Sequence, residues 1–205
     1  LTTSGGFVAL GRSLGHDVVL RPPRCAEAPY VLSWRDLPLT ETRVVVDECL
    51  GRFLGYFMGD GSYLKKAGGR AYAGVTGTLT IACTAKDEDV VADVARLCRE
   101  LFGREPAIST RHGASTVVLA DGMFFALLYR LGAIHKVKSD RNAWRRHVCV
   151  PEAIFRSPRS VVREFLRGLF ESDGTSAAHS HRVSMAAKSR EFLCDIQLLL
   201  LGFGI

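Results

Sequence analysis

The chain has 205 residues, and its 47% hydrophobic content excludes a largely disordered protein. This length accommodates one or two domains with a buried core. Its 27 basic and 21 acidic residues give a net charge of +6, which favours a polyanionic partner.

The six cysteines form no CxxC pair and show no zinc-ligand spacing, so they are predicted to be reduced core thiols. No signal peptide or run of about twenty apolar residues occurs, which predicts a cytoplasmic protein without membrane association. Because the chain starts at Leu1 and stops at Ile205 without a natural-looking start or tail, we expect it to be a piece of a longer polypeptide.

Residues 1–46 are rich in proline and β-branched residues and lack helical periodicity. This composition predicts a β-rich segment with short strands at residues 7–10, 18–20 and 43–46.

Residues 47–131 then alternate between helical and strand-like patterns. Helices are predicted over 47–60, capped by Asp47, and over 87–102, where apolar residues recur at helical spacing until Gly103. Strand pairs are predicted at 62–66 with 70–83 and at 106–110 with 115–120, before an apolar helix over 122–131. This order predicts one αββαββα unit.

The remainder repeats part of this pattern after a basic connector at residues 135–147. A helix is predicted over 160–173, a strand or hairpin over 176–185 and a helix over 188–201. At an offset of 102 residues, Lys188 matches Lys86 and Asp195 matches Asp93. Nothing after Ile205 corresponds to residues 105–131, so the second unit is predicted to be truncated.

A ten-residue stretch occurs twice, at 53–62 and 166–175, and aligns Asp60 with Asp173 at an offset of 113. Each copy is predicted to be a helix that ends in a carboxylate and is closed by a left-handed glycine. Small residues lie four apart on one face of each helix, at Gly51, Gly55 and Gly59 and at Gly168 and Ser172.

Two such faces are expected to pack with their backbones close, which would bring Asp60 and Asp173 together at one end. Two helix C-termini and two carboxylates attract a cation. Oxygen ligands and few protein groups suit a hard divalent ion that keeps its waters.

This duplicated stretch closely resembles the LAGLIDADG (dodecapeptide, DOD-type) motifs of homing endonucleases, especially those carried inside inteins. The resemblance implies an α+β fold of two pseudo-symmetric αββαββα repeats whose motif helices form the interface. Here the second repeat would be truncated and a short β-rich segment would precede the first. The implied division is residues 1–46, a first repeat over 47–140 and an incomplete second repeat over 141–205.

The resemblance also implies a site-specific double-stranded DNA endonuclease that hydrolyses phosphodiester bonds with Mg²⁺ or Mn²⁺. Asp60 and Asp173 would be the catalytic metal ligands, and the carbonyls of Gly59 and Ser172 would be additional ligands.

Residues 148–151 resemble the segment before the second motif in intein endonucleases, where a lysine lies three residues before the proline. Val148 occupies that position here, which puts catalytic competence in question. His147, Arg146 and Lys188 are the candidates that would replace this lysine.

Several basic residues on predicted strands and turns are candidates for contacts with DNA phosphates or base edges. An ordinary solvated hairpin or exposed turn is the alternative for each of them. These residues are Lys65, Lys66, Arg70, Arg111, His179, His181 and Arg182.

Residues 5–16 resemble the intein segment in which a Thr-x-x-His motif assists the first acyl shift, with Ser13 in place of the threonine and His16 as the histidine. A turn with a surface histidine is the alternative. Splicing also needs a first-residue Cys or Ser and a terminal His-Asn, so this chain alone is not expected to splice. The resemblance implies a flanking host protein, the extein.

Two other functions remain open. The same scaffold occurs in nucleic-acid-binding regulators and splicing factors that have lost catalysis; the two retained acids favour the enzyme, while Val148 and the truncated repeat favour this alternative. The second alternative is that the chain is part of a self-splicing intein.

Overall fold

The computed structural model describes residues 30–33, 43–66, 76–84, 87–119, 127–128, 131–133, 148–177 and 182–205. For residues 30–33, 43–44, 63–66, 76–79, 84 and 177 it describes the backbone alone. The predicted strands at 7–10 and 18–20 and the basic connector at 135–147 lie outside the described residues. Of the apolar helix predicted at 122–131, residues 127–128 are described as helical.

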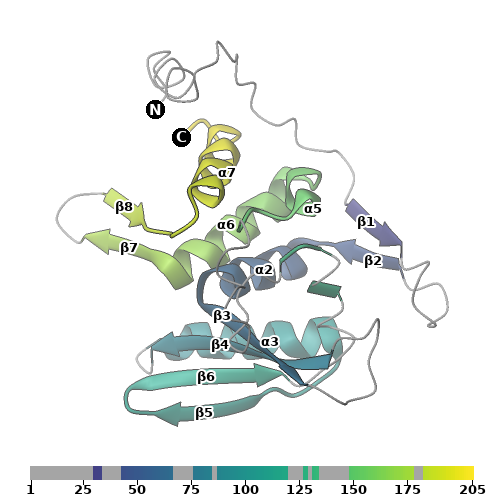
Figure 1. The fold of residues 1–205 in the computed structure, drawn as a ribbon, viewed down its shortest axis with the longest axis vertical. Coiled ribbons are helices and arrows are strands. Elements are labelled where there is room, and N and C mark those ends of the chain that lie inside the picture. The colour runs from purple at the N-terminus through teal and green to yellow at the C-terminus, as the bar shows by residue number, and fades with distance from the viewer. Residues whose placement is uncertain are drawn as a thin grey trace.

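The first repeat consists of a motif helix, a four-stranded antiparallel sheet and a covering helix (Figure 1). Strand β1 (Tyr30–Ser33) pairs with β2 (Arg43–Val46), directly before α2 (Glu48–Asp60). The sheet has the order β3-β4-β6-β5, with α3 (Glu88–Phe102) along one face. Its strands are β3 (Gly61–Lys66), β4 (Thr76–Thr84), β5 (Ala107–Arg111) and β6 (Ala114–Leu119).

The second repeat follows the same order with fewer elements. The short helix α5 (Glu152–Phe155) leads into the motif helix α6 (Arg159–Asp173), which the antiparallel hairpin of β7 (Gly174–Ala177) and β8 (Arg182–Met185) follows. Helix α7 (Arg190–Leu201) then corresponds to α3. The predicted α+β fold is therefore confirmed, and among the described residues the second repeat has fewer elements than the first.

Each motif helix passes directly into a strand, and this connection corrects one prediction. Gly61 and Gly174 are not left-handed: their φ and ψ values are −70° and 148°, and −80° and 149°. A Cβ atom at Gly61 would collide with the carbonyl oxygen of Phe57, and one at Gly174 with that of Phe170. Glycine is required because the strand starts against the last helical turn, so the constraint is space.

Helices α2 and α6 pack in parallel through their small residues, as predicted. A Cβ atom at Gly55 would lie 2.7 Å from the backbone nitrogen of Leu169 and 3.1 Å from the carbonyl carbon of Gly168. A Cβ atom at Gly59 would lie 2.9 Å from the Cβ of Ser172. The pairs 55–168 and 59–172 both differ by 113 residues, so equivalent positions of the two repeats meet at the interface.

The two motif helices differ in how completely they are buried. Along α6 one stripe of charged residues four apart is exposed, and its members are Arg159, Arg163, Arg167 and Glu171. The equivalent positions around α2 are fully buried and apolar: Val46, Leu50, Leu54 and Met58. This difference follows the smaller second repeat, in which the described residues after α6 form β7, β8 and α7.

Among the described residues, none of the helices combines the length and the apolar character that a membrane crossing requires.

Gly55→Ala is expected to lower the free energy of unfolding by about 1–3 kcal/mol. The added methyl group would overlap backbone atoms of α6, which cannot move aside as a flexible side chain would. Urea denaturation measures this change. In the control Gly202→Ala, the new Cβ would meet the carbonyl oxygen of Leu199 at 3.1 Å, and the change should stay below about 1 kcal/mol. Equal effects in the two variants would contradict close packing at Gly55.

Candidate active site

Asp60 and Asp173 are the last residues of α2 and α6, and both helices end at the same side of the molecule. The Asp173 carboxyl carbon lies 3.5 Å from the position that a Cβ atom would take on Gly59. Because Gly59 precedes Asp60, the two acid-bearing helix ends adjoin. Both acids are partly exposed, so solvent reaches this pair.

The groups at these helix ends fit a hard divalent cation that retains several waters. Two carboxylate-bearing helix ends adjoin, and each helix C-terminus adds partial negative charge. Within the part of the chain that the structure describes, no three or more His, Cys, Asp or Glu side chains are grouped so that they could hold a metal ion. An ion held here would therefore rely on two acids, backbone carbonyls such as those of Gly59 and Ser172, and water.

Two neighbouring side chains are poor ligands for such an ion. The Ser172 hydroxyl donates hydrogen bonds to the carbonyl oxygens of Gly168 and Leu169, at 3.1 and 3.0 Å. Burial raises the pKa of the Cys83 thiol to about 11, and the charge of Asp60 adds to this rise. A protonated, soft thiol is a poorer partner for a hard divalent ion than carboxylate and carbonyl oxygens are.

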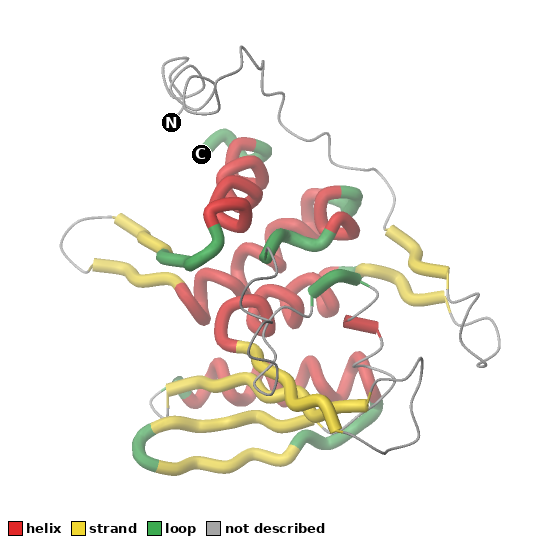
Figure 2. The backbone as a smooth tube through the Cα atoms, in the orientation of Figure 1, coloured by secondary structure: helices red, strands yellow, loops and turns green. Residues whose placement is uncertain are grey.

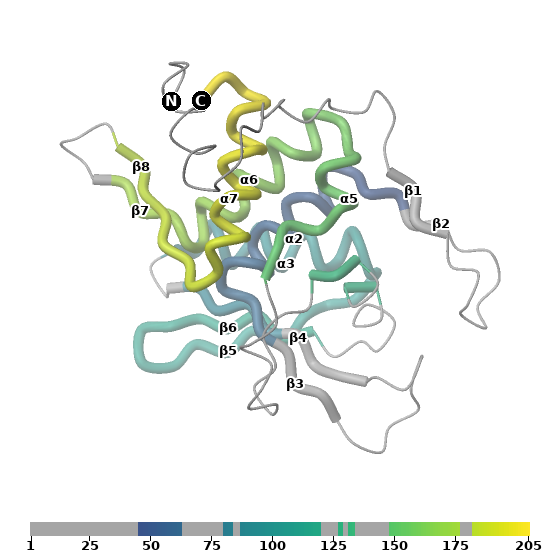
Figure 3. Tube along the Cα trace, turned by 45° about the horizontal axis from the view of Figure 1, so that its top comes forward, coloured from purple at the N-terminus to yellow at the C-terminus, as the bar shows by residue number. Residues whose placement is uncertain are grey.

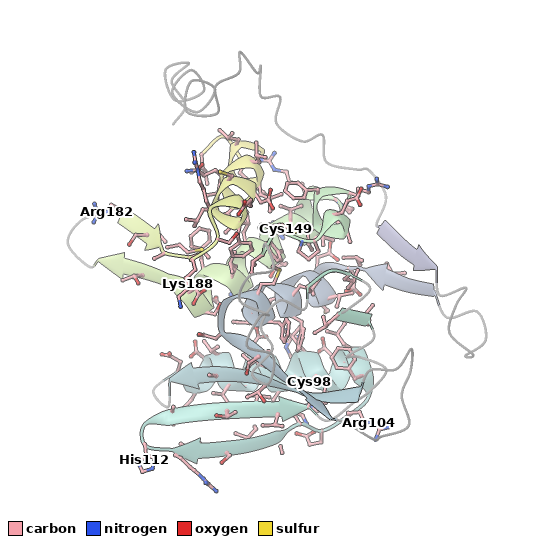
Figure 4. The ribbon with its side chains drawn as sticks, in the orientation of Figure 1. Cys98, Arg104, His112, Cys149, Arg182 and Lys188 are labelled. Atoms are coloured by element: carbon pink, nitrogen blue, oxygen red, sulfur yellow. The ribbon has the colours of Figure 1, made fainter. Side chains whose placement is uncertain are left out.

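Lys188 lies near Val148, the position at which the resemblance to intein endonucleases implies a lysine. Ser189, the residue after Lys188, donates a hydrogen bond to the carbonyl oxygen of Val148 at 2.7 Å. Figure 4 shows the Lys188 side chain directed, in that view, from the loop before α7 toward the end of α6. The other candidates, His147 and Arg146, lie outside the described residues.

The candidate DNA contacts lie on two groups of strands. Figures 2 and 3 show the four-stranded sheet and the β7–β8 hairpin as separate groups, with the ends of α2 and α6 between them. All of β5 is exposed, including Arg111, and Arg182 is exposed at the start of β8. Lys65 and Lys66 lie at the end of β3, although their side chains are not described. Outside the described residues are Arg70, His179, His181, Ser13 and His16.

An ion-pair cluster around Arg52 was not predicted, although an arginine within an apolar helix was a visible signal. Each nitrogen of its guanidinium faces a different carboxylate: Nε lies 2.5 Å from Asp93, Nη1 3.2 Å from Glu164 and Nη2 3.1 Å from Glu171. The Tyr56 hydroxyl donates to Glu171 and, at 3.1 Å, to Asp93. The cluster therefore joins α2, α3 and α6.

The charges of this cluster are mutually stabilised. Burial alone would lower the pKa of Arg52, but the hydrogen bond with Tyr56 and the surrounding carboxylates raise it. Burial acts in the opposite direction on the carboxyl group of Asp93 and would raise its pKa. The hydrogen bond from Arg96 and the charge of Arg52 outweigh burial and lower this pKa. The pKa of Tyr56 is raised by burial and by its bond to Glu171. At neutral pH the arginine and Asp93 are thus ionised and the tyrosine is neutral.

The family model that matches this chain describes a LAGLIDADG-like domain and covers residues 160–205. The probable translation initiation factor IF-2 of Thermococcus kodakarensis is 43% identical over 60 residues, which are 29% of this chain and 5% of that protein. The DNA polymerase II large subunit of the same organism is 28% identical over 155 residues, 75% of this chain and 8% of that protein. The chain thus spans less than a tenth of the length of these relatives.

Solved structures of the homing endonuclease I-DmoI share the fold. Its mesophilic variants match with a TM-score of 0.52 at 15% identity, covering 78% of this chain and 75% of that chain. I-DmoI in complex with DNA and Ca matches with a TM-score of 0.52 at 14% identity, covering 78% and 73%. The fold is therefore that of the LAGLIDADG homing endonucleases. More particularly, residues 160–205, which include α6 from its second residue onward and its acid, match the model of a LAGLIDADG-like domain.

Asp93→Asn is expected to make the free energy of unfolding depend less strongly on pH in the acid range. The pKa of Asp93 is lower in the folded chain than the unfolded value of about 3.9, so its stabilising contribution is present above that value and is lost as the pH falls through the folded pKa. Urea denaturation between about pH 3 and 7 should show a lower free energy of unfolding at neutral pH and a shallower loss toward acid.

The pseudo-equivalent Asp195 supplies the matched control. Burial raises its pKa, although its carboxylate accepts a hydrogen bond from the Val150 N–H at 2.9 Å. Its ionised form therefore opposes folding above the folded pKa, and this effect disappears in acid. In Asp195→Asn the free energy of unfolding should therefore fall more steeply toward acid pH. The same pH profile in both variants would contradict the opposite directions of the two pKa shifts.

Proposed function

We propose that this chain is the site-specific, double-stranded DNA endonuclease domain of an intein and that it serves intein homing. The observation that carries the proposal is the juxtaposition of the two acid-bearing helix ends, with the Asp173 carboxyl carbon 3.5 Å from a Cβ position on Gly59. One acid from each repeat beside a shared helix interface suits a reaction on two DNA strands.

Asp60 and Asp173 are proposed as the ligands of a divalent ion, with the carbonyls of Gly59 and Ser172 completing its protein contacts. When bound there, Mg²⁺ or Mn²⁺ would supply an activated water for in-line attack and stabilisation of the leaving oxygen. Structures of I-DmoI with DNA that include Ca, Mn or Mg support both a divalent ion and DNA as the partners of this fold.

The intein context is supported by the kinds of protein that this chain resembles. A translation initiation factor and a DNA polymerase subunit share no activity, and the resembling segments are 5% and 8% of their lengths. A mobile insertion in unrelated hosts accounts for this pattern. We propose accordingly that the parent polypeptide has flanking extein, that residues 1–46 are a splicing remnant with Ser13 and His16, and that the protein is cytoplasmic.

DNA is proposed to lie across the two groups of strands that flank the helix ends. Exposed Arg111 and Arg182 lie on different groups, which suits contacts on both sides of the cut. Lys65, Lys66, Arg70, His179 and His181 are proposed to add phosphate or base contacts. Neutralised phosphates make such binding weaken as salt rises.

The second candidate function is nucleic-acid binding without cleavage. The observation that favours it is Val148, a partly buried apolar residue at the position of the expected lysine. The neighbouring Lys188 is proposed to replace that lysine and so to keep the enzyme active.

The double variant Asp60→Ala, Asp173→Ala is expected to abolish cleavage of a plasmid that carries the parent gene's uninterrupted insertion site. Calorimetric Mn²⁺ binding should be lost as well, because the carboxylates are removed, whereas DNA binding in EDTA should persist. Wild-type DNA binding without cleavage under any divalent ion would favour the second function. Full cutting by the double variant would overturn the assignment of the acids.

Lys188→Met is expected to lower the cleavage rate roughly 100-fold, in the range by which a positioned proton-transfer group accelerates a reaction. DNA affinity in Ca²⁺ should change little, because one exposed phosphate contact contributes little to the total. Arg190→Met removes an exposed positive charge two residues away and serves as the control. Equal rates for the two variants would exclude a special role for Lys188.

A further inference from the structure

The small residues of the helix interface do not by themselves determine how far one helix lies along the other. Gly51, Gly55 and Gly59 repeat every four residues, as do Gly168 and Ser172. A slide of one turn, about 6 Å, would place Gly51 opposite Gly168 and Gly55 opposite Ser172. Close packing would survive this slide, but the two terminal acids would separate.

Arg52 distinguishes the observed register from the slid one. A Cβ atom on Gly168 would collide with the carbonyl oxygen of Arg52, so the arginine backbone sits directly on that glycine. Glu164 and Glu171 lie one turn to either side of Gly168, and both reach the guanidinium at 3.2 and 3.1 Å. A slide of about 6 Å in either direction would carry one of these two carboxylates out of contact.

The guanidinium is also held in place from the α2 side. Asp93 of α3 contacts its Nε at 2.5 Å, and the Tyr56 hydroxyl accepts a hydrogen bond from its Nη2 at 3.2 Å. Only 13% of the Arg52 side chain is exposed, so solvent screens these pairs weakly. Setting the register of packed helices is the best-attested role of buried polar and ionic groups.

The pseudo-symmetric position carries no such cluster. At the 113-residue offset the equivalent of Arg52 is Phe165, which is fully buried. Asp195, the counterpart of Asp93, instead accepts the Val150 N–H. One arginine from the first repeat and two glutamates from the second therefore form a single, one-sided contact.

We propose that Arg52 is a positioning residue. By pairing with both Glu164 and Glu171, it sets the axial register of α2 and α6. This register keeps Asp60 beside Asp173. The register claim stands on the contacts above. Its consequence for metal binding and cleavage rests on the proposed function.

An engineered disulfide at the N-terminal ends of α2 and α6, away from the acids, tests the register without metal or DNA. The Glu48 and Ser160 side chains are hydrogen-bonded there, so cysteines at these positions meet only in the observed register. A one-turn slide would exceed the Cα separation of about 4.4–6.8 Å that disulfides allow. The assay uses Glu48→Cys, Ser160→Cys in a background with Cys49→Ser and Cys149→Ser, and follows oxidation on non-reducing gels.

Arg52→Lys is the decisive variant, because it keeps a positive charge among the three acids and so protects folding, whereas one ammonium cannot span both glutamates. We expect disulfide formation to slow about tenfold at unchanged helix content by circular dichroism. Glu171→Gln should slow it as well. Arg96→Lys, which alters the exposed arginine paired with the other carboxylate oxygen of Asp93, should leave the rate unchanged. Unchanged rates in Arg52→Lys and Glu171→Gln, or no disulfide in the parent pair, would overturn the proposal.

Electron paramagnetic resonance of bound Mn²⁺ connects the register to the acid pair. Arg52→Lys is expected to bind Mn²⁺ about tenfold more weakly, in the range seen when groups that orient ligands are removed. Forced closure of the 48–160 disulfide should restore the affinity, which a general loss of stability would not predict. Absence of Mn²⁺ binding in the parent protein, with the disulfide result intact, would count against the proposed function and leave the register claim standing.

Discussion

The approach of two helix backbones is the constraint on which the rest of this structure depends. Glycine inside a helix costs about 0.5–1 kcal/mol relative to alanine, and α2 carries three of them on one face. The cost is offset because backbone atoms of α6 occupy the volume of the missing side chains. The same approach brings two carboxylate-bearing helix ends together, so packing and chemistry have one origin.

Polar groups also lie beside this apolar helix interface. Each nitrogen of the Arg52 guanidinium faces a different acid. Such a cluster adds little to net stability, because burying charges is costly. Its value lies in specificity, since few arrangements of α2, α3 and α6 satisfy every charge at once.

The two repeats differ around a shared interface. Positions that face the partner helix are small in both repeats. The positions that the buried Val46, Leu50, Leu54 and Met58 occupy in the first repeat are held by exposed charged residues on α6. Fold alone does not establish chemistry. For this chain the adjoining acid-bearing helix ends support the proposed catalysis, and the contact of Ser189 with Val148 places the neighbouring Lys188 where the proposal needs a lysine.

Local patterns in the sequence determined the motif helices, the strand pairs and the alignment of Asp60 with Asp173, because helical period, capping by Asp47 and duplication are properties of nearby or repeated residues. Tertiary structure alone decided three features: the extended conformation of Gly61 and Gly174, the cluster around Arg52, and the contact of Ser189 with Val148. The cluster and the Ser189 contact join residues far apart in the sequence, and no local period encodes such pairings. The conformation of the two glycines depends instead on the direction of the strand that follows each helix, which the pairing of that strand decides.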